Sequence, residues 1–143
     1  MANTAGVPTY ANYRIKCMTA AYPATGMKVA LYSTSATIDP TATVYTTTGE
    51  VTGSGYTAGG ITVNSATAPL HASNTTYWTP GANWVFSGVS IGPTDCAMLY
   101  DTNDANANRG VFTFGAQTIV SGTLTLQMPS NTNTTALVRF NWT

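Results

Sequence analysis

The sequence has few charged residues and no long apolar run. Only 7% of its 143 residues are charged, five basic and five acidic, and the net charge is zero. Nucleic acids and anionic membranes attract proteins with basic surfaces, so we expect neither as a partner. No run approaches the roughly 18 apolar residues of a membrane span. The first residues, MANTAGVPTY, lack the basic and apolar regions of a secretory signal.

Cysteine and histidine are also scarce. Cys17 and Cys96 are too few for the disulfide framework of a small secreted domain. We expect two free thiols, with a Cys17–Cys96 bridge as the alternative. His71 is the only histidine, and neither a CxxC spacing nor a G-x-S-x-G motif accompanies it. These absences argue against a zinc site and a serine-histidine triad, so we expect no enzyme, no metal and no cofactor.

Threonine takes the place of the missing charges, with 28 residues. Aromatic residues make up 10% of the chain, which together with the zero net charge favours a folded domain over disorder. The clearest patterns, MKVALYS, TLTLQM and ALVRFNW, alternate apolar and polar residues and are typical of strands with one buried face. The alternation predicts a core that contains Val29, Leu31, Leu124, Leu126, Met128, Val138 and Phe140.

Turn-forming pairs such as Gly59-Gly60, Pro80-Gly81 and Gly92-Pro93 separate the apolar runs. Short strands at this spacing, without helical crossovers, predict an all-β, single-domain antiparallel β-sandwich, jelly-roll-like or immunoglobulin-like. We expect residues 1–26 to form an N-terminal arm with at most one short helix, and residues 27–143 to form the sandwich. The predicted strands are 27–33, 43–52, 60–65, 67–73, 83–90, 95–101, 109–115, 118–128 and 135–142.

The segment DTNDANANRG, residues 101–110, offers several oxygen ligands but lacks the EF-hand spacing. Positions five, six and twelve of such a loop fall on Ala105, Asn106 and Phe112. We expect a polar hairpin loop, because Asn and Asp tolerate left-handed backbone conformations. An irregular cation site is the alternative.

The densest aromatic patch comprises Tyr77, Trp78, Trp84 and Phe86. Aromatic residues dominate cores and subunit contacts, so packing is the first interpretation, and the four residues are candidate partner contacts. Exposed rings on a β-sandwich also stack on sugars. The same residues are therefore candidate glycan contacts if the chain is a carbohydrate-binding adhesin module.

Two blocks of the sequence resemble small Thr/Gly-rich virion proteins of tailed bacteriophages. The first block is KVALYSTSATIDPTATVYTTTGEVTGSGYTAGGITV, and the second combines AMLYDTNDANANRGVFTFG with SGTLTLQMP. The resemblance covers roughly residues 27–140. It implies a structural role on the phage particle and no catalytic motif.

The resemblance and the hydroxyl-rich composition together lead us to expect a non-enzymatic capsid decoration or cement protein that stabilises the phage head. A neck, tail or head-fibre component is the alternative. The expected partners are the major capsid protein or other virion proteins, and further copies of the chain, since unprotected strand edges suit proteins that are meant to be paired. The expected location is the virion, after synthesis in the bacterial host cytoplasm.

Overall fold

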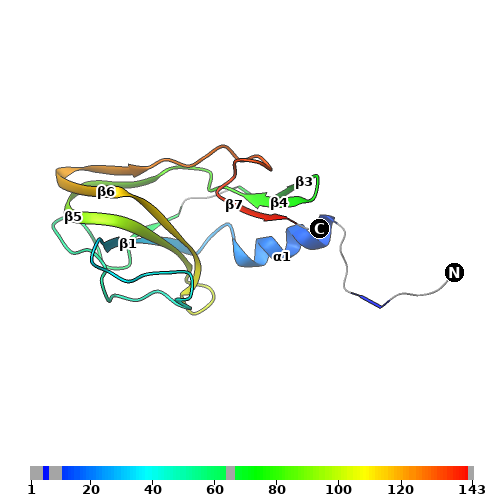
Figure 1. The fold of residues 1–143 in the computed structure, drawn as a ribbon, viewed down its shortest axis with the longest axis horizontal. Helices are drawn as coiled ribbons and strands as arrows, with labels where there is room; N and C mark the ends of the chain where they lie inside the picture. Colours follow the sequence, from blue (N-terminus) through cyan, green and yellow to red (C-terminus); the bar gives the residue numbers. More distant parts are fainter. Residues whose placement is uncertain (1–4, 7–10, 64–66, 142–143) are drawn as a thin grey trace.

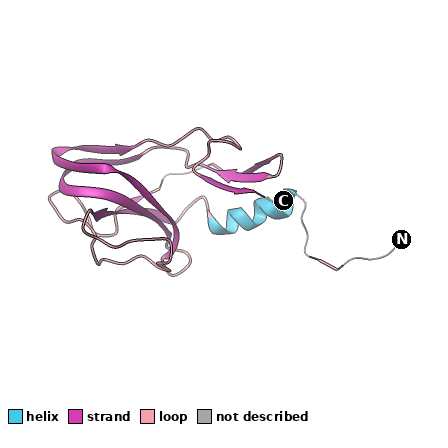
Figure 2. Cartoon of the chain, in the orientation of Figure 1, coloured by secondary structure: helices cyan, strands magenta, loops and turns pink. Residues whose placement is uncertain are grey.

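The structure is a computed structural model that describes residues 5–6, 11–63 and 67–141 (Figure 1). These residues form one short helix and two antiparallel sheets (Figure 2), so the prediction of a sandwich-like all-β fold is confirmed. The four-stranded sheet has the order β2-β1-β5-β6, and the three-stranded sheet has the order β3-β4-β7. The elements are α1 (Ala11–Ala21), β1 (Met27–Ser33), β2 (Ile61–Thr62), β3 (Leu70–Ala72), β4 (Thr75–Trp78), β5 (Trp84–Asp101), β6 (Ala107–Leu126) and β7 (Val138–Asn141).

The larger hydrophobic core joins both sheets and the helix. Met18 of α1 packs in one cluster with Leu31 of β1, Trp78 of β4 and Leu99 of β5. Figure 1 shows α1 beside the small sheet, at the end where it meets the large one. The helix of the predicted N-terminal arm therefore contributes to the common core. The first part of that arm, residues 1–4 and 7–10, lies outside the described residues.

The loop between β1 and β2 covers the second face of the large sheet. Tyr32 and Met98 are fully buried on that face, and Ile38 and Tyr45 of the loop pack against their cluster. The loop returns to β1 at Gly60, where φ is +77° and a Cβ would collide with the carbonyl oxygen of a β1 residue. The apolar residues of the loop therefore attach it to the second face of the large sheet.

The predicted strand at 43–52 is wrong. This stretch forms only isolated bridges, Val44 with Ala107 and Glu50 with Tyr32. Threonine-rich sequence favours extended backbone, but a strand needs a continuous partner. Here the stretch meets β6 near Val44 and β1 near Glu50, and it does not continue along either strand.

β5 and β6 form one long hairpin, where the sequence predicted four shorter strands. The turn expected at Gly92-Pro93 is instead an irregular part of β5, with register shifts against β6 around Val89, Ile91 and Thr94. A proline is tolerated inside a sheet at such bulges, because the extra residue already interrupts the ladder. The predicted breaks at 91–94 and 116–117 are therefore bends within continuous strands.

The remaining strands are shorter than predicted. β2, β3 and β7 each occupy part of the ranges 60–65, 67–73 and 135–142. Asn64, Ser65 and Trp142, at the ends of those ranges, lie outside the described residues. β4 lies between the predicted strands 67–73 and 83–90, in a stretch that the sequence does not predict as a strand; two of its residues, Tyr77 and Trp78, belong to the aromatic patch.

The predicted core residues differ in burial. Val29, Leu31 and Leu124 are buried, whereas Leu126, Met128 and Val138 are half-buried and pack against the core. The expectation for Phe140 is wrong, because its side chain is 46% exposed. Phe140 and Val138 alternate onto the same face of β7, but Phe140 lies near the end of the small sheet. There, no described element closes over the ring.

The two cysteines are free, as expected: Cys17 is exposed on α1 and Cys96 is buried in β5. Cys96 packs in the smaller core cluster beside Tyr32 and Met98, where it acts as a small apolar side chain. Within the described residues, the helix is too short to cross a membrane.

Candidate functional site: the open edge of β6

The predicted aromatic patch is buried and does not form a surface. Trp78, Trp84 and Phe86 are at most 2% exposed, and Tyr77 is 9% exposed. Three of the rings pack on other aromatic rings, in the pairs Trp78–Tyr22, Phe86–Tyr56 and Trp84–Phe112. The packing interpretation therefore holds for the four residues, and their burial leaves no ring face on the surface for a glycan or a partner. The physical reason is that a domain of this size has to place its largest apolar side chains inside.

The loop between β1 and β2 is held by the only glutamate of the chain. Glu50 accepts hydrogen bonds from Tyr45 Oη at 2.6 Å, from Tyr56 Oη at 2.7 Å and from the Gly59 N–H at 2.7 Å. Tyr56 Oη accepts the backbone N–H of Leu31 at 2.9 Å, which ties the loop to β1. Hydrogen bonds to a charged acceptor are stronger than neutral ones. Glu50 therefore organises a segment that otherwise consists mostly of small and hydroxylic residues.

Two more tyrosines fasten the same loop. We call the four residues Tyr32, Tyr45, Tyr56 and Tyr100 the tyrosine cluster. Tyr32 Oη donates to the carbonyl of Thr46 at 2.7 Å, and Tyr100 Oη donates to the carbonyl of Gly59 at 2.6 Å. The rings of Tyr45 and Tyr100 stack with centroids 4.6 Å apart. The cluster is a structural fastening of the loop to the large sheet, because each hydroxyl is engaged within the fold.

The tyrosine cluster predicts that the protein loses stability at alkaline pH. Burial raises the pKa of Tyr32 to about 12, and burial followed by the hydrogen bond to Glu50 raises the pKa of Tyr45 above its usual value of 10.0. A group whose pKa is higher in the folded protein stabilises fully below the unfolded pKa and loses that contribution as the pH rises through the folded pKa. We therefore expect the free energy of unfolding to fall between about pH 10 and pH 12, measured by urea denaturation.

The matched variant for this prediction is Tyr45→Phe, which keeps the stacked ring and removes one titrating hydroxyl. Its free energy of unfolding should fall less steeply with pH in the same window. An unchanged stability of the wild-type protein across the window would contradict the role given to the cluster.

The loop at 101–110 connects β5 to β6, and the prediction of a polar hairpin loop is confirmed. One guanidinium nitrogen of Arg109 lies 2.7 Å from the carboxylate of Asp104 and 3.5 Å from that of Asp101. Arg109 Nε donates to the carbonyl of Ala21, at the end of α1, at 2.8 Å. In the described part of the chain, no group of three His, Cys, Asp or Glu side chains is placed to hold a metal ion. The loop therefore ties the hairpin to the helix.

β6 is the outer strand of the large sheet, and most of its outer side is open (Figure 1). Only its beginning is covered, where the N–H of Asn108 donates to the carbonyl of Thr43 at 2.9 Å and Ala107 bridges to Val44. From Val111 to Leu126, the described residues provide no backbone partner on the side away from β5. We call this open side of Val111–Leu126 the β6 edge.

The β6 edge lacks the charged residues and prolines that protect many edge strands, although the register shifts against β5 bend it. Natural proteins protect such edges with lysine, proline or inward-pointing charges, because open N–H and C=O groups pair with other chains. The stretch Gly110–Met128 contains no charged residue and no proline. Val120 on this strand is 80% exposed, more than the other exposed large hydrophobic side chains of the described residues. The edge is therefore chemically suited to contact with another strand.

An apolar groove of about 510 Å³ lies along β6. Its apolar lining consists of Trp84, Phe112, Phe114, Leu126, Met128 and Leu137. Trp84 is 2% exposed, and its Nε1–H is buried without an acceptor in the part of the chain that the structure describes. A buried donor without a partner destabilises a protein by about 1–3 kcal/mol. The groove therefore combines an uncharged apolar lining with one N–H group, that of Trp84, that has no hydrogen-bond acceptor among the described residues.

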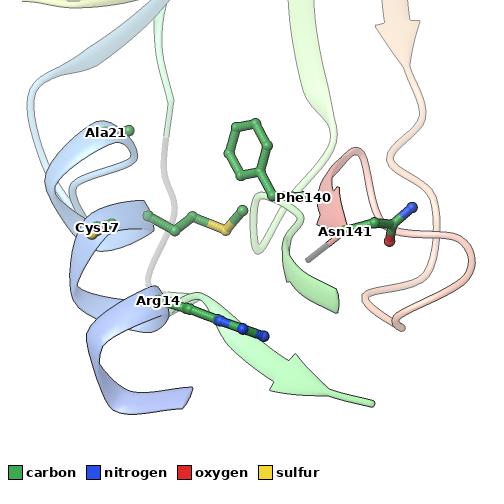
Figure 3. A pocket seen from close by; sticks show the side chains of 6 residues that line it. Arg14, Cys17, Ala21, Phe140 and Asn141 are labelled. Atoms are coloured by element: carbon green, nitrogen blue, oxygen red, sulfur yellow. The ribbon is translucent and has the colours of Figure 1, made fainter. Parts of the chain in front are cut away.

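A second pocket, of about 400 Å³, lies between α1 and β7 (Figure 3). Figure 3 shows Phe140 directed from β7 toward the helix, where Arg14, Cys17 and Ala21 line the opposite wall. This open space explains why the ring of Phe140 remains half exposed.

His71, the only histidine and the residue considered for a zinc site or a catalytic triad, lies in β3 of the small sheet. Its Nδ1 is 3.0 Å from Thr76 Oγ1.

Sequence reasoning singled out neither Glu50 nor Arg109, and it did not locate the β6 edge. Two signals were available: Glu50 is the only glutamate, and Gly110–Met128 contains neither a charge nor a proline. The position of β6 at the outside of the sheet was not available, since strand order depends on long-range pairing.

Comparison of the chain with protein-family models, with curated proteins and with solved structures finds no match.

Proposed function

We propose that the protein is a non-enzymatic structural protein of a tailed-bacteriophage virion that decorates the capsid and cements it. The resemblance of residues 28–63 and 97–129 to small phage virion proteins supports the assignment to the particle. The single observation that carries the contact role is the β6 edge, an open, uncharged and proline-free strand beside an apolar groove. Such a strand gives affinity through its backbone groups.

Cementing follows from mass action. A protein that binds the assembled shell and not the dissociated subunits stabilises the shell by about 2.7 kcal/mol at one hundred times its Kd. Since Gly110–Met128 contains no charge, attachment should depend weakly on salt. The proposed partners are the major capsid protein or other virion proteins and further copies of the chain, and the proposed location is the virion.

A neck, tail or head-fibre component would use the same kind of surface. It would differ from a capsid decoration protein in its copy number per particle. The carbohydrate-binding alternative has less support, because the residues named for it are buried: Trp78 is fully buried and Trp84 is 2% exposed. The experiment below separates the positions on the particle.

We expect particles that lack this protein to release DNA at a lower temperature than complete particles in the same buffer. The measurement is thermal DNA release, followed with an intercalating dye, together with the copy number of the chain per purified virion from quantitative mass spectrometry. Adding the purified protein back should restore the release temperature at both low and high salt. Hundreds of copies indicate the capsid, whereas a dozen or fewer indicate the neck or tail.

Equal release temperatures for complete and depleted particles would rule out a cement. Absence of the chain from purified virions would rule out the whole assignment. Heat-inactivated protein is the negative control and should leave the release temperature low. Wild-type protein added afterwards is the positive control and should raise it.

A further inference from the structure

We propose that two copies of this chain pair through the β6 edge, antiparallel and related by a twofold axis. The two four-stranded sheets would then form one continuous sheet, β2-β1-β5-β6 followed by the same strands of the second copy in reverse order. The inference rests on the backbone and composition of β6 and not on the assignment to the virion. The pairing uses the end of the β6 edge near Leu124, and it leaves the earlier part of the edge, from Val111, for the contact with the shell.

The first step is the geometry of the edge. Near its end β6 is a regular ladder with β5, where Leu124 lies opposite Phe86 and Leu126 lies opposite Trp84. Leu124 is buried, and its neighbours Thr123 and Thr125 are exposed, so the side chains alternate cleanly between core and solvent. In an antiparallel ladder, the N–H and C=O groups of every second residue point away from the partner strand, toward the open side. This part of β6 is thus a template for one more strand.

The second step is the choice of occupant. A twofold interface brings each surface against itself, so a charged residue near the axis would face its own copy. Like charges directly opposite one another on paired strands are destabilising. Gly110–Met128 contains no charge of either sign, which removes this obstacle to self-pairing. It also offers no charge that would select a charged partner, and a second copy has a net charge of zero, so no net repulsion opposes its approach.

The third step is the apolar surface beside the edge. Val120 is 80% exposed, and the apolar groove is lined by Phe114 and Leu126 of β6 itself. Exposed apolar surface next to an open strand edge is a feature of strands that associate. A second copy would add its own threonines and apolar side chains to this surface, which supplies contact area in addition to the backbone hydrogen bonds.

The test uses charge at two exposed positions of the edge. Wild-type protein should sediment as a dimer in a dilution series from about 100 µM to about 1 µM. With the twofold axis at Leu124, Thr123 of one copy faces Thr125 of the other, so the variant T123K/T125K places like charges against each other and should raise the dimer Kd at least about tenfold at low salt. The variant T123E/T125E should do the same. An equimolar mixture of the two variants should restore the dimer, because opposite charges then meet across the edge.

The matched control is T47K/T57K, which makes the same two changes on exposed loop threonines away from β6. It should leave the dimer unchanged. Circular dichroism and the thermal midpoint of all variants should match the wild type, since the substituted side chains point to solvent. A wild-type monomer at about 100 µM would overturn the proposal. So would a dimer that withstands both edge variants, or a mixture that fails to re-associate.

Discussion

The substitution Trp78→Ala is expected to lower the free energy of unfolding by about 3–5 kcal/mol, the range for truncating a buried tryptophan. Trp78 is fully buried in β4, and its ring stacks on Tyr22 with centroids 4.9 Å apart. Its Nε1–H donates to the carbonyl of Thr67 at 3.1 Å. The loss is a large share of the 5–15 kcal/mol that stabilises a typical domain. The measurement is urea denaturation followed by circular dichroism.

Two variants sharpen this prediction. Trp78→Phe keeps an aromatic ring against Tyr22 and loses the hydrogen bond, so its effect should be smaller than that of Trp78→Ala. Leu70→Ala removes a side chain that is 45% exposed on the neighbouring strand β3 and should change stability by less than about 0.5 kcal/mol. If Trp78→Ala were as mild as Leu70→Ala, the ring would have to be accessible, and a sugar-stacking role would again be a reasonable hypothesis.

The substitution Arg109→Met is expected to cost about 3–5 kcal/mol of unfolding free energy, because it removes the counter-charge of the buried Asp101 carboxylate and leaves it only the hydrogen bond from the Asn103 N–H. The side chain of Asp101 is 3% exposed, and the guanidinium of Arg109 lies 3.5 Å away. Arg109 also links the hairpin to the end of α1 through the carbonyl of Ala21. Methionine keeps the apolar part of the side chain, so the loss reports mainly the missing charge and hydrogen bonds.

The matched control is Asp104→Asn, which removes the other carboxylate near the same guanidinium. Asp104 lies 2.7 Å from Arg109, but its side chain is 66% exposed. Exposed ion pairs contribute about 0–1 kcal/mol, so the effect should be small although the distance is shorter. The double variant Asp101→Asn/Arg109→Met should recover part of the stability lost in Arg109→Met. Equal losses for Arg109→Met and Asp104→Asn would contradict the assigned role of Asp101.

Several parts of the fold follow from local sequence. MKVALYS predicts β1 with the bounds that the structure has, Met27–Ser33, and TLTLQM predicts the buried Leu124 at the end of β6. Both predictions rest on a period of two, which is a property of the backbone of a strand. The fold class follows from the same pattern repeated along the chain.

Other features depend on which segments meet. The predicted strand at 43–52 is a loop, because its side chains pack on the face of the large sheet and its backbone pairs with the strands only at isolated bridges. The turn signal at Gly92-Pro93 became a bend inside β5, because β6 continues alongside and maintains the pairing. Local propensity is weak compared with such tertiary pairing.

The candidate site shows the same division. Composition and alternation are enough to show that the protein is a charge-poor β domain and that Gly110–Met128 lacks the charges and prolines that protect strand edges. Long-range packing places β6 at the outside of the sheet, turns Trp78 and Trp84 toward the core, and leaves Phe140 half exposed. Composition and alternation are encoded residue by residue, whereas strand order and burial arise from contacts between residues that are far apart in the chain.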